Sequence, residues 1–378
     1  STGHQVVNRP YQETSSRVSG SEIISSNSKT SYNGNYGLNA SWTLYNGNKR
    51  LKTIQQEKLN NQMAELDVAT SENNIQESIA QVYIQILYAA ESVKVNENTL
   101  QVSIAQRDRG QELLNAGSIA KSDLAQLEAQ VSTDRYQLVT AQATLEDYKL
   151  QLKQLLELDG ENEMNIYLPA LSDENVLAPL PTKRDVYISA LSLRPEIEAS
   201  KLNVEASELG INIAKSSYFP TISLSAGIGT NHTSGSDFTF GEQVKNGWNN
   251  SIGLSVSVPI FNNRQTKSAV QNAKLQYETS MLSLLDEQKA LYKTIESLWL
   301  DANSAQQRYA AANEKLKSTQ ISYELISEQF NLGMKNTVEL LTEKNNLLQA
   351  QQEQLQAKYM AILNTQLLKF YQGDQLAI

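Results

Sequence analysis

The chain has 378 residues, a net charge of −9 and no cysteine. The length allows two ordinary domains, and the negative charge argues against nucleic-acid binding as the main task. The absence of thiols excludes disulfides and cysteine-ligated metals, and no stretch approaches the ~18 apolar residues of a transmembrane helix.

The first clear element is a β-strand. Residues 3–9 show a weak strand pattern, and residues 11–33 are rich in Ser, Thr and Asn, which predicts a loop. Residues 35–45 then alternate between an apolar face and a small polar face. The apolar face carries Tyr36, Leu38, Ala40, Trp42 and Leu44. This period of two predicts a strand that ends at Asn46-Gly47.

Two long helices follow. Residues 48–109 contain neither Gly nor Pro, which predicts a helix of roughly 90–100 Å. A turn at 115–121 reverses the chain, and a second helix over 121–158 runs back roughly 55 Å. Asp134 and Glu146 on this second helix are expected on a solvated face.

The middle of the chain is irregular and then becomes helical again. Residues 159–184 contain Gly160 and several prolines, which predicts a linker. A helix over 183–217 follows, and Pro195 is expected to split off its first turns.

The pattern of strand and long helix then recurs. Strands are predicted from 220 to about 230 and over 251–260, with a polar, Gly-rich loop at 231–248 between them. A long helix restarts near Asn263 and reaches a turn at 331–336. A return helix covers 337–371, and a short tail covers 372–378.

The recurrence is a duplication. Residues 113–125 (LLNAGSIAKSDLA) resemble 329–341 (QFNLGMKNTVELL) with a shift of 216, the spacing between Gly117 and Gly333. The same shift holds over roughly a hundred residues, so the chain contains two copies of one structural unit. The second copy begins with the helix 183–217, which the first copy lacks. We therefore expect about 30–40 further residues to precede Ser1.

The two turns share a chemistry. Gly117 and Gly333 supply the left-handed backbone that ends a helix. Ser122 and Thr337 are expected to cap the next helix. Asp123 and Glu339 follow in its first turn, where negative charge suits the helix dipole.

The strand faces point to a membrane. An apolar face opposite a small polar face fits a barrel between lipid and water, or a soluble sheet that covers a helical bundle. One chain offers at most four strands, which cannot close a barrel, and lipid does not tolerate open edges. Two chains would give eight strands and three would give twelve, and the pattern alone allows both.

Three sets of residues carry a family resemblance. They are residues 218–224 (YFPTISL), residues 258–261 (VPIF), and the Asn-Ala-Gly and Asn-Leu-Gly turns. With the duplication, the chain resembles the TolC-type outer-membrane efflux proteins over nearly its whole length. The resemblance implies an α+β membrane protein: a homotrimer with a long antiparallel helical tunnel and four strands per chain in one twelve-stranded barrel.

The resemblance divides the chain into seven segments. These are barrel strands and an extracellular loop (1–46), a tunnel hairpin (47–158), an equatorial linker (159–184), a tunnel helix (185–217), barrel strands and a loop (218–262), a second tunnel hairpin (263–371) and a tail (372–378).

The implied function is an exit duct and not an enzyme. Family members conduct small molecules across the bacterial outer membrane, working with a periplasmic adaptor protein and an inner-membrane pump, and need no cofactor. The alternatives are type I protein secretion, a soluble coiled-coil scaffold, and an adhesin or phage receptor that uses the loops. The 5 methionines argue against a Met-lined path for soft metals. The 2 histidines, His4 and His232, stand in no catalytic motif.

The resemblance also implies site residues. The adaptor-docking candidates are Gly117, Ser118, Gly333 and Met334. Glu339 stands where the family places an acidic ring, and three carboxylates around a pore would collect cations. Asp123 and Lys335 stand at the positions of inter-helix gate partners. Phe330 replaces the usual tyrosine, and Thr342 replaces a second acidic residue, so we expect a single acidic ring.

Three aromatic residues mark the junction of strands and helices. Tyr218, Phe219 and Phe261 are expected to form a girdle at the membrane interface, because aromatic rings favour that depth, and so to contact outer-membrane lipid.

Overall fold

The computed structural model describes residues 2–10, 15–19, 22–26, 30–158, 166–167, 176–234 and 238–376. These residues form two compact units. The first comprises Ser1–Asn61 with Asn203–Met281, and the second comprises Gln62–Leu202 with Leu282–Ile378. Each unit therefore draws on both halves of the duplicated sequence.

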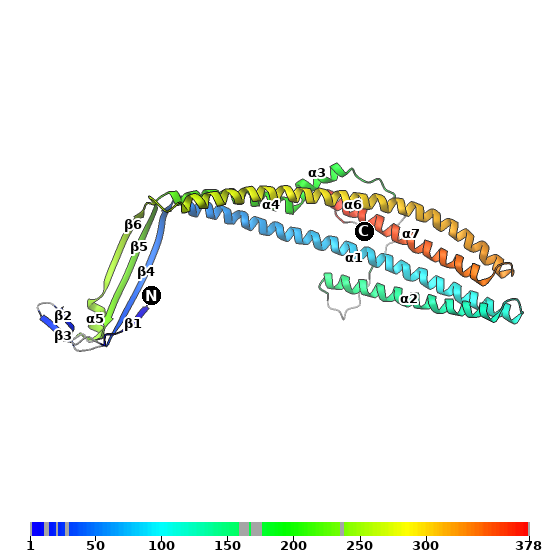
Figure 1. Cartoon of the computed structure of the whole chain (residues 1–378), viewed down its shortest axis with the longest axis horizontal. Helices are drawn as coiled ribbons and strands as arrows, with labels where there is room; N and C mark the ends of the chain where they lie inside the picture. The colour runs from blue at the N-terminus through cyan, green and yellow to red at the C-terminus, as the bar shows by residue number, and fades with distance from the viewer. Residues whose placement is uncertain are drawn as a thin grey trace. The chain divides into compact units, whose positions relative to one another are not determined.

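The first unit is built on a four-stranded antiparallel sheet in the order β1-β4-β5-β6 (Figure 1). The strands are β1 (Thr2–Asn8), β4 (Thr30–Asn46), β5 (Thr221–Thr233) and β6 (Asn249–Ser257). The weak pattern at 3–9 is thus confirmed as a strand. Within the described part of the chain, β1 and β6 pair on one side only, so both edges of the sheet are open.

The two faces of the sheet differ as the alternation predicts. Trp42, Leu224 and Leu254 share one row across three strands. Trp42 is 62% exposed and Leu254 is 66% exposed. Other apolar side chains on this face are also exposed. This apolar face has no cover within the described chain, so it is available to lipid or to another partner.

The polar segment at 11–33 contains more structure than a loop. β2 (Ser15–Ser19) and β3 (Glu22–Ser26) form a separate two-stranded hairpin, and β4 already begins at Thr30. The remaining residues between 11 and 29 lie outside the described ranges. The Ser-rich composition gave no apolar alternation, and pairing between backbones makes strands without it.

The segment at 231–248 also differs from the expectation of a loop. It contains the short helix α5 (Phe240–Asn246). Thr239 Oγ1 accepts a hydrogen bond from Glu242 N, and Glu242 Oε2 accepts one from Thr239 N at 2.8 Å. The Thr-x-x-Glu spacing is the sequence signature of this capping box. β6 ends at Ser257, short of the predicted residue 260, because Pro259 cannot donate to a ladder.

The helices follow the predicted order, with antiparallel pairs in the second unit (Figure 1). They are α1 (Lys49–Asn115), α2 (Lys121–Leu155), α3 (Lys183–Leu193), α4 (Pro195–Lys215), α6 (Gln265–Asn331) and α7 (Thr337–Gln372). The expected break at Pro195 is confirmed. Of the linker, only 166–167 and 176–184 are described, and Val176 and Ala178 accept hydrogen bonds from Gln306 Nε2.

Arg194 organises the break between α3 and α4. Arg194 is 6% exposed. Its Nε donates to Glu196 Oε1 at 2.8 Å, and its Nη2 lies 3.4 Å from Glu77 Oε1 on α1. It also stacks 4.3 Å above the Tyr371 ring near the end of α7. Burial raises the pKa of Tyr371 to about 12. One buried cation therefore ties three helical segments together.

Gly47 and Gly117 give a matched test of backbone constraint. Both have left-handed φ values, +65° and +73°. A Cβ at Gly47 would lie 2.6 Å from Ser216 O, whereas a Cβ at Gly117 would meet nothing within 4 Å. We predict that Gly117→Ala costs about 1 kcal/mol, and that Gly47→Ala costs about 2–4 kcal/mol because the overlap adds to the strain. Thermal unfolding in detergent measures both, and equal losses would contradict this account.

Candidate functional site: the helical tips and the helix walls behind them

The two tips are built by the same backbone hydrogen bonds. At the first, Ser118 N donates to Leu113 O at 2.8 Å and Gly117 N donates to Leu114 O at 2.9 Å. At the second, Met334 N donates to Gln329 O at 2.8 Å, with the matching bond from Gly333 N to Phe330 O. This pair of bonds defines the Schellman motif, which needs a left-handed residue at the glycine.

The carboxylates that follow the glycines accept hydrogen bonds from backbone N–H groups at the start of the next helix. Asp123 Oδ2 accepts from Ala120 N at 3.0 Å. Glu339 Oε2 accepts from Asn336 N at 3.2 Å, and Asn336 Oδ1 accepts from Glu339 N at 2.9 Å. Asp123 therefore forms half of a capping box, whereas Asn336 and Glu339 together form a whole one.

The expectation that Ser122 and Thr337 are the caps is wrong. The cap positions are Ala120 and Asn336. Each helix begins earlier than the Ser or Thr suggests, which puts both hydroxyls inside the first turn. Thr337 is only 1% exposed there.

Lys335 pairs with Glu339. Its Nζ lies 2.6 Å from Glu339 Oε1, one helical turn away. The hydrogen bond from Lys335, followed by the bond from Asn336 N, lowers the pKa of the Glu339 carboxyl. Within this chain, Asp123 bonds its own helix end, so the two expected gate partners are not joined to each other.

Phe330 lies in the core of the tips. It is 3% exposed and packs in one cluster with Leu127 on α2 and Leu340 on α7. The cluster also contacts Leu113 on α1, so both hairpins end at about the same level. Phe330 therefore acts by packing in this state, while Met334, at 71% exposed, projects from the tip.

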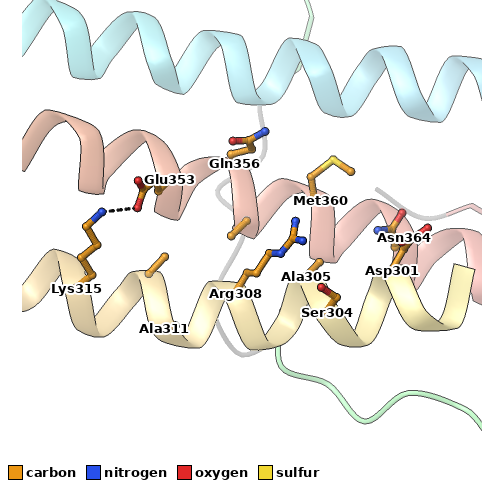
Figure 2. A pocket seen from close by; sticks show the side chains of 12 residues that line it. Asp301, Ser304, Ala305, Arg308, Ala311, Lys315, Glu353, Gln356, Met360 and Asn364 are labelled. Carbon is orange, nitrogen blue, oxygen red and sulfur yellow. Dashed lines mark hydrogen bonds and ion pairs between the residues drawn. The ribbon is translucent and has the colours of Figure 1, made fainter. Parts of the chain in front are cut away.

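A groove runs along the wall between α6 and α7, away from the tips (Figure 2). Its volume is about 620 Å³. Small side chains, including Ala305 and Ala357, line its base, and charged side chains from both helices line its rim. Lys315 Nζ and Glu353 Oε2 form an ion pair of 2.7 Å at one end.

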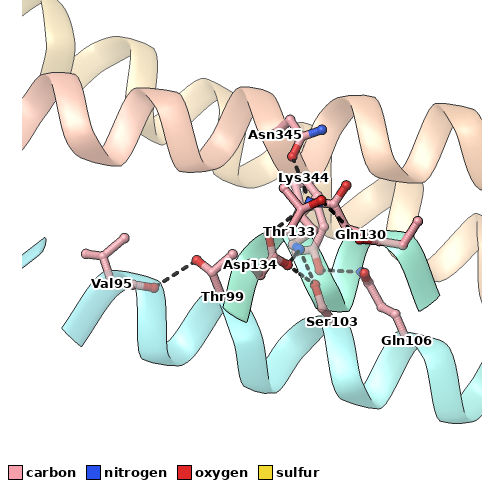
Figure 3. Close-up of polar contacts among 11 residues, drawn as sticks. Val95, Thr99, Ser103, Gln106, Gln130, Thr133, Asp134, Lys344 and Asn345 are labelled. Carbon is pink, nitrogen blue, oxygen red and sulfur yellow. Dashed lines mark hydrogen bonds and ion pairs between the residues drawn. The ribbon is translucent and has the colours of Figure 1, made fainter. Parts of the chain in front are cut away.

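A buried ionic cluster joins α1, α2 and α7 behind the tips (Figure 3). Lys344 Nζ donates to both Asp134 Oδ2 and Ser103 Oγ, and Ser103 Oγ donates to Asp134. Gln130 Nε2 donates to the second oxygen, Asp134 Oδ1, at 2.8 Å. Asp134 is 1% exposed and Lys344 is 3% exposed.

The expectation that Asp134 lies on a solvated face is therefore wrong, whereas Glu146 is exposed and pairs with Lys149. Burial lowers the pKa of the Lys344 ammonium, and Asp134 opposes that shift. Spacing could have signalled the burial. Asp134 lies three residues after Val131, and Lys344 lies four after Leu340, both on apolar stripes.

The expected girdle residues are exposed, with Phe261 at 84%. An aromatic group at the other end of the sheet was not expected from the sequence. His4, Gly34 and His232 share one row across β1, β4 and β5. Tyr32 OH lies 2.7 Å from His4 Nδ1, and Phe240 packs against His232. The row depends on strand register, which the sequence does not show.

Among the residues that the structure describes, no helix combines the length and apolar character that a membrane span requires. Nor do three or more acidic or histidine side chains within those ranges come together in a way that could hold a metal ion.

The sequence matches the outer membrane efflux protein family over residues 10–157 and 186–373. The chain belongs to this family, a class of bacterial outer-membrane channel proteins. Membership confirms the expected fold class and location, and it rejects the soluble coiled-coil scaffold.

Curated relatives agree with this assignment. The outer membrane efflux protein BepC of Brucella suis is 24% identical over 77% of this chain and 61% of its own length. The outer membrane protein TolC of Escherichia coli K12 is 24% identical over 75% of this chain and 58% of its own length. This chain thus spans about three fifths of these relatives.

Solved structures share the fold. CusC superposes with a TM-score of 0.77 at 19% identity, covering 99% of this chain and 83% of that chain. The outer-membrane channel OprN gives a TM-score of 0.75 at 18% identity, covering 100% and 81%.

The buried cluster yields a stability prediction. Asp134→Leu leaves the Lys344 charge buried without its partner, and we expect a loss of about 3–5 kcal/mol. The double variant Asp134→Leu/Lys344→Met removes both charges and should recover most of that loss. Thermal unfolding in detergent measures both variants.

Glu198→Gln is the matched control, because it breaks the exposed pair with Lys201. We expect it to change stability by less than about 1 kcal/mol. A double variant as unstable as Asp134→Leu would show that the cluster acts through packing and not through charge.

Proposed function

We propose that the chain is one protomer of a homotrimeric exit duct that conducts small molecules out through the outer membrane in a tripartite efflux pump. The supporting observation is the sheet, which has an exposed apolar face and two open edges, β1 and β6. Lipid does not tolerate such edges, so neighbouring chains must pair with them. Three four-stranded sheets would make a twelve-stranded barrel, within the range known for outer-membrane barrels.

The tips are the proposed docking end for the adaptor protein, through which the inner-membrane pump acts. Gly117, Ser118, Gly333 and Met334 are exposed on turns closed by backbone hydrogen bonds, which supports this role. A turn held in this way presents a fixed surface, so little conformational freedom is lost when a partner binds.

The proposed ion-selective ring is made of Glu339 from each protomer. The lowered pKa of this carboxyl keeps it charged at mildly acidic pH. Asp123 and Lys335 are proposed to exchange partners between the closed and open tips, because each has a local partner that could be replaced.

The proposed lipid contacts are the aromatic rings at the junction of sheet and helices. Tyr218 and Phe219 are 55% and 52% exposed, and Phe261 is more exposed than either. Exposed rings beside an apolar sheet face fit the boundary between lipid tails and headgroups.

Type I protein secretion is the second candidate function. One relative, 21% identical over 80% of this chain, is named alkaline protease secretion protein AprF, of Pseudomonas aeruginosa. Transport assays with a small dye and with a secreted passenger protein separate the two roles.

The duct predicts a trimer. Protein extracted from the outer-membrane fraction in mild detergent should show a native protein mass three times the mass of the single chain on a denaturing gel. A species that is soluble without detergent and remains a monomer or dimer would end the duct hypothesis.

A Ser118→Asp/Met334→Asp variant should keep the trimer and lose export, and full export by that variant would exclude these tips from adaptor docking.

The ring predicts cation selectivity. Glu339→Gln should shift the reversal potential of a planar-bilayer channel in a salt gradient toward the non-selective value, because three charges leave the pore. In the unaltered channel, selectivity should persist as pH falls through the ordinary Glu range and disappear only below it, because the pKa is lowered. Asp108→Asn, an exposed acid paired with Arg107, is the control. Identical reversal potentials for Glu339→Gln and the unaltered channel would remove Glu339 from this role.

A further inference from the structure

One chain carries two surfaces in its second unit that have no partner within the described chain. The first is the groove between α6 and α7. On α6, Arg308 lies over it (Figure 2). In the described part of the chain, Arg308 has neither an ion pair nor a hydrogen bond. An unmatched guanidinium beside an alanine-lined groove suits a helix that brings both apolar and acidic side chains.

The second surface is a stripe on α2. Tyr136, Val139, Ala143, Asp147 and Leu150 recur at helical spacing, so they lie on one face. Tyr136 is 74% exposed, Val139 is 58% exposed and Leu150 is 49% exposed. Apolar residues at intervals of three and four are the knobs of coiled-coil packing.

The two surfaces lie at the same height above the tips. The groove residues of α6, from Asp301 to Lys315, lie about 24–45 Å from the end of that helix. The stripe from Tyr136 to Leu150 lies about 22–44 Å from the start of α2. The shared tip cluster, which includes Leu127 and Phe330, brings both tips to one level.

In a cyclic ring of chains, the equal heights of the stripe and the groove allow these two surfaces to meet. A ring of identical chains uses a heterologous interface, in which one surface meets a different surface of the next chain. Rotation about the ring axis involves no translation along it. Surfaces on parallel-running helices can therefore meet only if their heights agree, and these two do.

We propose that the α2 stripe of one protomer packs into the α6–α7 groove of the next. In this contact between protomers, called the seam below, Asp147 pairs with Arg308. The proposal rests on the homotrimer of the proposed function and specifies which residues join it. Tyr136, Val139 and Leu150 fill the groove over the alanine base. Asp147 lies between Ala143 and Leu150 on the stripe, where its carboxylate can reach across to the guanidinium.

The chain has no cysteine, so crosslinking tests the register directly. Ala143→Cys on α2 and Ala311→Cys on α6 stand at heights that differ by about 3 Å. Since a disulfide requires Cα atoms within about 7 Å, the double variant should give covalent dimers and trimers after oxidation. The single variants should stay monomeric on a denaturing gel, as should Ala143→Cys/Ser318→Cys, whose heights differ by about 13 Å.

Charge reversal tests the pair. Arg308→Asp and Asp147→Arg should each lower the trimer fraction in native mass measurements at low concentration, and the double variant should restore it. Lys317→Asp is the matched control, since it changes an exposed α6 residue outside the groove.

The outcomes separate the seam from the duct. A trimer that forms without the Ala143–Ala311 crosslink, or a double charge reversal that adds the two single losses, would overturn the seam and leave the duct intact. A chain that stays monomeric before any substitution would overturn the duct itself.

Discussion

Open strand edges in a membrane are the constraint on which this architecture depends. The four-stranded sheet exposes its apolar face and leaves the backbone of β1 and β6 unpaired on one side within the described chain. Water cannot satisfy those groups inside lipid, and the proposed duct pairs them with the strands of other copies of the chain. In the proposed trimer, the long helices of the three protomers share one ring.

The duplication gives the two helical hairpins the same tip structure. Positions where the two copies differ mark contacts that only one hairpin makes. The two tips repeat the same Schellman hydrogen bonds and the same carboxylate that closes the next helix. Lys344 and Asp134 break the repeat, because their counterparts at the shift of 216 are Glu128 and Ala350. This buried ion pair ties one hairpin to the other.

Agreement between sequence and structure follows the range of the interactions. The strand over 35–45 and the break at Pro195 depend on neighbouring residues, and both are confirmed. The caps expected at Ser122 and Thr337 are wrong because a helix can begin one or two residues away from a suitable hydroxyl. The helix α5 was missed although Thr239 and Glu242 carried its signature.

The sequence by itself determined the duplication, the long helices, the alternating strands and the positions of the tips, because each is a local or periodic property. Only the tertiary structure decided that Phe330 is buried among residues of other helices and that Lys344 meets Asp134. It also decided which faces of α2 and α6 remain unmatched. Such contacts join residues far apart in the chain, so no local pattern specifies them.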